Sequence, residues 1–199
     1  EAFVGIMSRF DNPILGILAG LVVTSVIQSS SASVGILQVL AGSGVIPFSS
    51  AVFVLFGQNI GTCVTALLAS IGTSRNAKRT TIIHLSFNLI GTIIFTILAI
   101  CFPLADFVAA FTPGNVVAQI ANMHTLFNVV TTLLLIPFGG ALASLSEHIL
   151  PGNDHEDMGT KVMYLNAKAA NSKIGSSAIS IEQVKMETLR MLKIAEDNV

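Results

Sequence analysis

The sequence predicts an all-α membrane protein with a re-entrant helical hairpin, a broken transmembrane helix, two further spans and a soluble helical tail. Hydrophobic residues make up 52% of the 199 residues, charged residues make up 11%, and the mean hydropathy is +0.78. Most of the charged residues lie after residue 152. We therefore expect a membrane part, residues 1–152, and a cytoplasmic tail, residues 153–199. The net charge of −1 argues against a nucleic-acid partner, which would favour a basic surface.

A polar cluster interrupts the first apolar stretch of the chain. The segment Gln28-Ser29-Ser30-Ser31-Ala32-Ser33 places five hydrogen-bonding side chains in six positions. Lipid offers such groups no partners, and an unsatisfied polar group there costs on the order of several kcal/mol. The cluster therefore predicts a binding site.

The segments on either side of this cluster predict the hairpin, residues 13–42. At about 1.5 Å per residue, residues 13–27 reach roughly 22 Å, which is short of a ~30 Å hydrocarbon core. Residues 34–41 then form about two apolar turns before the turn signal Gly42-Ser43-Gly44. Gly16 and Gly20 are spaced for close helix contact. Two half-length helices joined at a polar tip indicate a segment that enters and leaves the membrane on the same side.

Residues 45–71 are long enough to cross the membrane, but Gly57-Gln58-Asn59-Ile60-Gly61-Thr62 lies near their middle. Two glycines that enclose an amide pair favour an unwound segment. We therefore expect a second helix start at Gly61 or Thr62. Ser31 or Ser33 would cap the second helix of the hairpin in the same way.

Two uninterrupted spans follow, at residues 80–102 and 115–138. Arg75, Lys78 and Arg79 precede the first of them, and basic residues mark the cytoplasmic side. Both spans contain the pattern HxxFN, as His84 to Asn88 and as His124 to Asn128. A His and an Asn four residues apart share one helix face, so they predict hydrogen bonds between helices. A proton relay or a direct ligand role is the alternative.

The two expected helix starts at mid-depth favour anion binding, because helix N-termini carry partial positive charge. No Lys or Arg occurs in residues 10–74 or in residues 80–152. A multivalent anion would therefore need a co-bound cation held by neutral oxygens. Amide, hydroxyl and loose carbonyl oxygens at the two breaks provide the ligand set of a sodium-coupled symporter with discontinuous helices.

The segments TSVIQSSSASVGIL, GQNIGTCVTALLASIGTSRNAKR, HLSFN and MHTLFN together resemble the second half of the type II sodium/phosphate cotransporters, over residues 12–152. The resemblance implies one half of an inverted-repeat transporter, not an enzyme, in the cell membrane and more specifically the bacterial inner membrane. It implies phosphate binding by Gln28, Ser29, Ser30, Ser31 and Asn59. It implies sodium binding by Gln28, Ser30, Ser33, Gln58, Asn59 and Thr62. Supporting roles fall to His84, Asn88, His124 and Asn128.

The family carries its QSSS signature once in each of two inverted repeats, whereas this sequence shows one. We expect that the first repeat lies outside these residues or that a second copy of the chain completes the site. The chain begins at Glu1, which suggests a piece of a longer protein. In the tail, residues 181–199 resemble the opening helix of a PhoU-like domain. Ser180 and Gln183 predict a capping box, followed by an apolar stripe.

Three alternatives remain at this stage. The first is a transporter of another small oxyanion, and the second is a membrane-anchored phosphate-regulatory protein whose tail does the work. The third is an intramembrane serine hydrolase that uses one serine of residues 29–33 with His84 or His124 as base. The serine cluster lacks the glycine-flanked setting of such nucleophiles. Cys63 and Cys101 are expected to be small buried hydrophobic residues.

Overall fold

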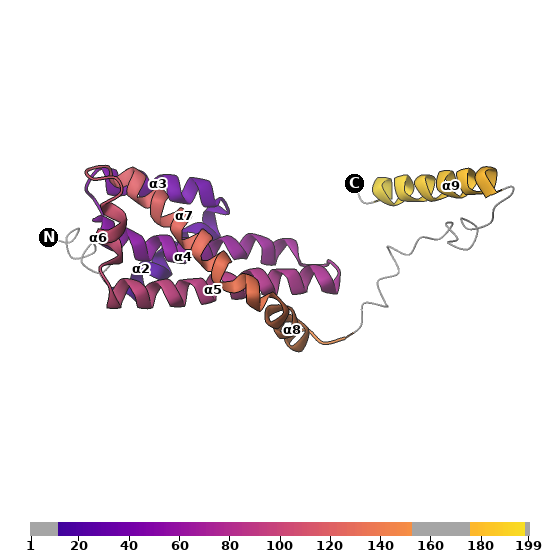
Figure 1. The fold of residues 1–199 in the computed structure, drawn as a ribbon. Coiled ribbons are helices and arrows are strands. Elements are labelled where there is room, and N and C mark those ends of the chain that lie inside the picture. Colours follow the sequence, from indigo (N-terminus) through magenta and orange to yellow (C-terminus); the bar gives the residue numbers. More distant parts are fainter. Residues whose placement is uncertain (1–11, 153–175, 198–199) are drawn as a thin grey trace. The chain divides into compact units, whose positions relative to one another are not determined.

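The computed structural model describes residues 12–152 and 176–197 (Figure 1). The chain divides into two compact units, Glu1–Gly152 and Asn153–Val199. The described residues form helices joined by turns, which confirms the all-α class. Three helical stretches in the described ranges are long and apolar enough to cross a membrane: α4 (Phe48–Ala69), α5 (Arg75–Cys101) and the stretch Val116–Ile149.

Two shorter apolar helices precede them, α2 (Pro13–Ile27) and α3 (Ser30–Gly42). The Oδ1 atom of Asn12 caps α2 by accepting from Ile14 N at 3.0 Å. Only Gln28 and Ser29 separate α2 from α3. Gln28 has a φ of 55°, in the left-handed region, and its N–H still donates to Thr24 O at 2.8 Å. One left-handed residue therefore ends α2, and α3 begins two residues later.

The N-cap of α3 is Ser29, whose Oγ accepts from Ala32 N at 3.4 Å. The expectation that Ser31 or Ser33 caps this helix is wrong. Because the turn takes only two residues, α3 begins at Ser30, and both expected caps lie inside the helix. The structure therefore adds Ser30 and Ser31 to the first turn of α3, where backbone N–H groups have no partner within the helix.

The expected break in residues 45–71 is also wrong, because α4 runs without interruption from Phe48 to Ala69. Its two glycines instead face α2 at very short range. A Cβ atom at Gly57 would lie 1.9 Å from Ile17 O, and one at Gly61 would lie 2.7 Å from Leu21 O. On the facing helix, a Cβ at Gly20 would lie 1.9 Å from Val54 O. These glycines permit a close helix crossing and do not unwind the helix.

Continuity of α4 has a direct consequence for the site. The carbonyl groups near residues 57–62 remain within helical geometry, so the expected loose carbonyls are not present there. The second expected helix start, at Gly61 or Thr62, does not exist either. Within the described membrane part, the N-terminus of α3 is therefore the helix start at the polar cluster.

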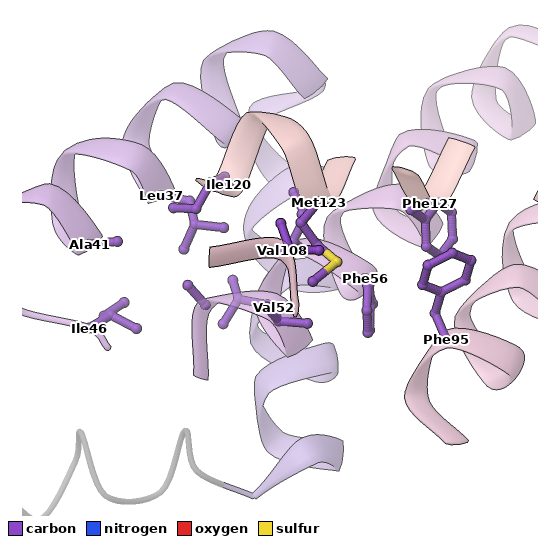
Figure 2. Packing of buried hydrophobic residues seen from close by; sticks show 13 residues of the cluster. Leu37, Ala41, Ile46, Val52, Phe56, Phe95, Val108, Ile120, Met123 and Phe127 are labelled. Carbon is purple, nitrogen blue, oxygen red and sulfur yellow. The ribbon is translucent and has the colours of Figure 1, made fainter. Parts of the chain in front are cut away.

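An aromatic cluster joins α4, α5 and α7 (Val116–Leu135). Figure 2 labels its three rings, Phe56, Phe95 and Phe127, which are all less than 2% exposed. The Phe56 ring centroid lies 5.8 Å from that of Phe95 and 5.6 Å from that of Phe127, and the latter two are 5.0 Å apart. Aromatic pairs at such distances contribute about 0.5–1.5 kcal/mol each beyond the burial of their area. This packing fixes the register of α4 against α7.

The other described elements of the first unit are α6 (Leu104–Ala109), the 3-10 helix η2 (Ile136–Phe138) and α8 (Gly139–Ile149). The Arg79 guanidinium holds the end of α8: its Nη2 donates to Leu150 O at 3.2 Å and to Gly152 O at 2.8 Å. Carbonyl groups at a helix C-terminus lack partners within the helix, and a cation there also interacts favourably with the helix dipole.

The second unit contains α9 (Ser176–Asp197). The predicted capping box at Ser180 is wrong, since α9 begins four residues earlier and Ser180 lies inside it. The predicted apolar stripe is exposed, with Ile181 at 68% and Leu192 at 61%. Of the two cysteines, Cys63 is buried as expected, but Cys101 is exposed near the end of α5, in an apolar segment of spanning length.

Candidate functional site

A pocket of about 270 Å³ lies at the tip of the helical hairpin, lined by Ser30, Ser31, Val34 and His124. The two serines belong to the first turn of α3, and His124 comes from α7, more than 90 residues along the chain. Hydroxyl groups and first-turn N–H groups are hydrogen-bond donors, and the helix dipole adds partial positive charge. The pocket is therefore suited to a small anion.

Gln28 and Ser29 lie at the turn itself and are exposed in the described structure. Gln28 is the one non-glycine residue of the described ranges with a positive φ. Such conformations persist where the surrounding structure enforces them, and they cluster at functional sites. The turn thus presents both side chains away from the core, while Ser30 and Ser31 line the pocket.

The ring of His124 is held by α4. Its Nε2 atom lies 3.2 Å from Oδ1 of Asn59, a side chain that is 6% exposed. Phe56 and Phe127 stand three residues from Asn59 and His124 respectively, so the aromatic packing places both polar side chains one helical turn away. The oxygen of Asn59 contacts the histidine, and its Nδ2 atom is buried without a partner in the described part of the chain.

A buried polar layer lies beside the pocket. Gln58 Nε2 donates to Ser33 O at 3.0 Å and so joins α4 to α3. The Gln58 Oε1 and Ser33 Oγ atoms are buried and have no hydrogen-bond partner among the described residues. An unsatisfied buried polar group costs about 1–3 kcal/mol, and native proteins retain few of them. Two such oxygens on facing helices favour a ligand between or beside them.

Thr62 is placed differently from the prediction. Its Oγ1 atom donates to Gln58 O at 3.0 Å, along its own helix. The hydroxyl oxygen keeps its acceptor capacity. Thr62 can therefore still offer an oxygen to a cation, although the loosened backbone expected around it does not exist.

The two HxxFN motifs are alike in one respect and different in another. Asn88 Nδ2 donates to His84 O at 3.0 Å, and Asn128 Nδ2 donates to His124 O at 2.8 Å, so both amides bond to their own helix. Asn88 also lies 3.3 Å from Cys63 Sγ on α4. The His124 ring reaches α4, whereas no hydrogen bond to the His84 ring occurs among the residues described. The expected bonds between helices are thus confirmed for His124 and Asn88.

Sequence reasoning missed Thr24 and Val34. The Thr24 side chain is 1% exposed, its Oγ1 has no partner in the described part of the chain, and Gly61 packs against it. A threonine one turn before Gln28 was a usable signal, because position 24 shares a helix face with position 28. Val34 gave no signal, since it is one of many apolar residues in the hairpin.

The long apolar helices and the paired short ones define a polytopic membrane protein. The sequence profile of the Na+/Pi-cotransporter family matches residues 2–139, and the chain belongs to this family of transporters. No solved structure matches the chain.

Three relatives illustrate this membership. The uncharacterized protein YqeW of Bacillus subtilis is 36% identical over 135 residues, which cover 68% of this chain and 43% of that protein. The sodium-dependent phosphate transport protein 2C of Mus musculus is 35% identical over 138 residues, 65% of this chain and 22% of that protein. The putative inorganic phosphate export protein YjbB of Salmonella typhimurium is 25% identical over 178 residues, 89% of this chain and 31% of that protein. The chain thus spans less than half the length of these relatives.

Proposed function

We propose that this chain forms part of a sodium-coupled phosphate symporter of the bacterial inner membrane, with phosphate in the hairpin pocket and sodium in the adjacent polar layer. The observation that carries the proposal is the convergence of Ser30, Ser31 and His124 on one pocket at the N-terminus of α3. Family membership and relatives named for phosphate transport support this substrate.

Phosphate binding rests on hydrogen-bond donors. Ser30 and Ser31 provide hydroxyl groups, and the first turn of α3 provides N–H groups and the positive end of a helix dipole. Gln28 and Ser29 border the same tip. No Lys or Arg occurs in residues 10–74 or 80–152, so these neutral donors balance only part of the anion's charge.

Sodium supplies the remaining charge as a co-substrate. Ser33 Oγ and Gln58 Oε1 are buried oxygens without partners in the described structure, and a hydroxyl and an amide oxygen are suitable neutral ligands for sodium. Further oxygens can come from residues near these two in sequence: Gln28 and Ser30 precede Ser33, and Thr62 follows Gln58 by one helical turn. Asn59 holds His124 through Oδ1, and its Nδ2 atom, buried without a partner among the described residues, can still donate to the ligand.

In this proposal, a second protein segment covers the exposed side of the site and completes it. Gln28, Ser29 and Ser31 are exposed in the described unit, although their sequence is that of a binding tip. An inverted repeat or a second copy of the chain would cover them with a matching hairpin. The tail would lie in the cytoplasm and begin a PhoU-like domain.

The pocket also brings together serine hydroxyls and a histidine, the residues that a serine hydrolase would need. A nucleophilic serine requires a hydrogen bond to its base, and no such bond joins His124 to Ser30 or Ser31 in the described structure. The ring nitrogen Nε2 instead contacts Asn59. Membership of a transporter family favours coordination of an anion by these serines.

Uptake of labelled phosphate into proteoliposomes that contain the intact protein tests the proposal. We expect uptake with an inward sodium gradient and none when choline replaces sodium. The double variant Ser30→Ala, Ser31→Ala loses two donors worth about 1–3 kcal/mol each, so its uptake should fall at least about thirtyfold. Ser43→Ala, at the far end of α3, is the matched control. Normal uptake by a folded double variant would contradict the assignment of the pocket.

A further inference from the structure

We propose that His124 makes the pocket selective for protonated tetrahedral oxyanions, namely phosphate and arsenate, against unprotonated ones such as sulfate. Asn59 acts in this proposal as the positioning residue for the His124 ring. The inference rests on the proposed function, since it concerns the same pocket. It goes further by naming the residue that distinguishes two anions of nearly equal size and shape.

First, the His124 imidazole must present a lone pair to the anion. We take His124 as neutral and Oδ1 as the Asn59 atom that faces it; an amide oxygen only accepts hydrogen bonds, so the 3.2 Å contact then assigns the ring hydrogen to Nε2. A neutral imidazole with hydrogen on Nε2 carries a lone pair on Nδ1. Asn59 is buried on α4 and therefore holds this tautomer from within the core.

The second step concerns the other groups around the pocket. The hydroxyl groups of Ser30 and Ser31 can both donate and accept, the N–H groups of the first turn of α3 only donate, and Val34 offers no polar side-chain atom. In this proposal Nδ1 of His124 faces the anion, and among the four lining side chains it is the group that only accepts. It can pair with an oxyanion only where that oxyanion carries a hydrogen.

The third step is the chemistry of the anions. Phosphate and arsenate keep at least one hydrogen at neutral pH, so one P–OH or As–OH group can donate to Nδ1. Sulfate has none, and its oxygen lone pairs would face the lone pair of the ring. A site built to bond a substrate hydroxyl rejects analogues that lack it far more strongly than an apolar pocket rejects a change of size.

Wild-type protein in proteoliposomes gives a first test, with sodium present and phosphate uptake measured against competitors. Arsenate should compete about as well as unlabelled phosphate, and sulfate at least about a hundredfold more weakly. Monofluorophosphate separates hydrogen bonding from charge, because it is a doubly charged phosphorus oxyanion without a hydrogen at neutral pH. We expect it to compete as weakly as sulfate. Competition equal to that of arsenate would overturn the inference.

Variants give a second test with a matched control. His124→Gln supplies an amide N–H as well as an oxygen, so phosphate uptake should persist while the preference over sulfate falls below about tenfold. Asn59→Ala should also lower this preference, because it frees the ring, and a purely structural role would not change the ratio. His84→Gln, in the twin motif outside the pocket, should leave the ratio unchanged.

The outcomes distinguish failure of the proposed function from failure of the selectivity proposed for His124. Absence of sodium-dependent phosphate uptake by the wild type would refute the proposed function, and this inference with it. Normal uptake with the same phosphate-to-sulfate ratio in wild type and His124→Gln would refute the inference alone. Equal changes of the ratio in His124→Gln and His84→Gln would likewise overturn it, because the effect would then not depend on the pocket.

Discussion

The imidazole of His124 and the amide of Asn59 join α7 to α4, with 3.2 Å between Nε2 and Oδ1. The same histidine lines the pocket beside Ser30 and Ser31 of α3. One side chain therefore links the hydrogen-bonded interior of the membrane part to the hairpin tip. A change in the packing of α4 against α7 will therefore move the His124 ring in the pocket. The backbone of His124 belongs to α7, whereas its hydrogen-bond partner Asn59 belongs to α4.

The close crossing of α2 and α4 predicts a strong response to small added volume. Gly57→Ala places a methyl group 1.9 Å from Ile17 O, so it should destabilise the protein by about 1–3 kcal/mol or more. Thermal unfolding in detergent measures this. Gly35→Ala on α3 is the control, since no atom lies within 4 Å of its added Cβ and alanine favours a helix. Equal stability of the two variants would show that α4 does not pack on α2 as described.

The effect of Ser33→Ala on stability depends on whether sodium binds the Ser33 hydroxyl. If this buried hydroxyl has no ligand, Ser33→Ala should leave stability unchanged or raise it. We expect instead a loss of about tenfold or more in sodium affinity, together with loss of the thermal stabilisation that sodium gives the wild type. The measurement is the melting temperature against sodium concentration, with choline as the salt control.

Thr131→Val is the matched variant for this experiment. Its hydroxyl is also buried without a partner in the described residues, but it packs against Gly91 at the contact of α7 and α5. It should leave the sodium response unchanged. A sodium response lost equally in both variants would place the effect in general packing and not in the polar layer.

Arg79 predicts a local effect at the end of α8. Arg79→Gln removes the guanidinium that bonds the carbonyl groups of Leu150 and Gly152, so the last turn of α8 should open more often. Hydrogen exchange of the amides near residues 146–152 should speed up, with little change in α4. Lys78→Gln, which removes a neighbouring charge, should not reproduce this. Unchanged exchange in the Arg79 variant would show that these bonds do not hold the helix end.

Several features could be predicted from local sequence. The all-helical class and the three helices of spanning length follow from composition and apolar length, and the structure confirms both. The short helices α2 and α3 lie where Pro13, the polar cluster and Gly42 indicated boundaries. Such signals work because each depends on a few neighbouring residues. That α2 and α3 enter and leave the membrane on one side stays a prediction.

Other features depended on partners that sequence does not show. The local sequence around Gly57 and Gly61 predicts a helix break, but the backbone of α2 lies against both glycines and makes them packing residues. His84 and His124 have the same local pattern, and only the fold places His124 beside the serines. Ser180 gave a plausible cap, but α9 begins before it. For the glycines and the histidines, the tertiary neighbour decides between two interpretations of the same residue.

The central claim is that sodium and phosphate bind together in a pocket without Lys or Arg, and calorimetry on the intact protein in nanodiscs tests it most directly. Phosphate is titrated in sodium and in choline, and sodium is titrated with and without phosphate. We predict that each ligand tightens the other by the same factor, because coupling of binding energies is reciprocal. Measurable phosphate affinity should require sodium. Equal phosphate affinity in sodium and in choline would contradict the account.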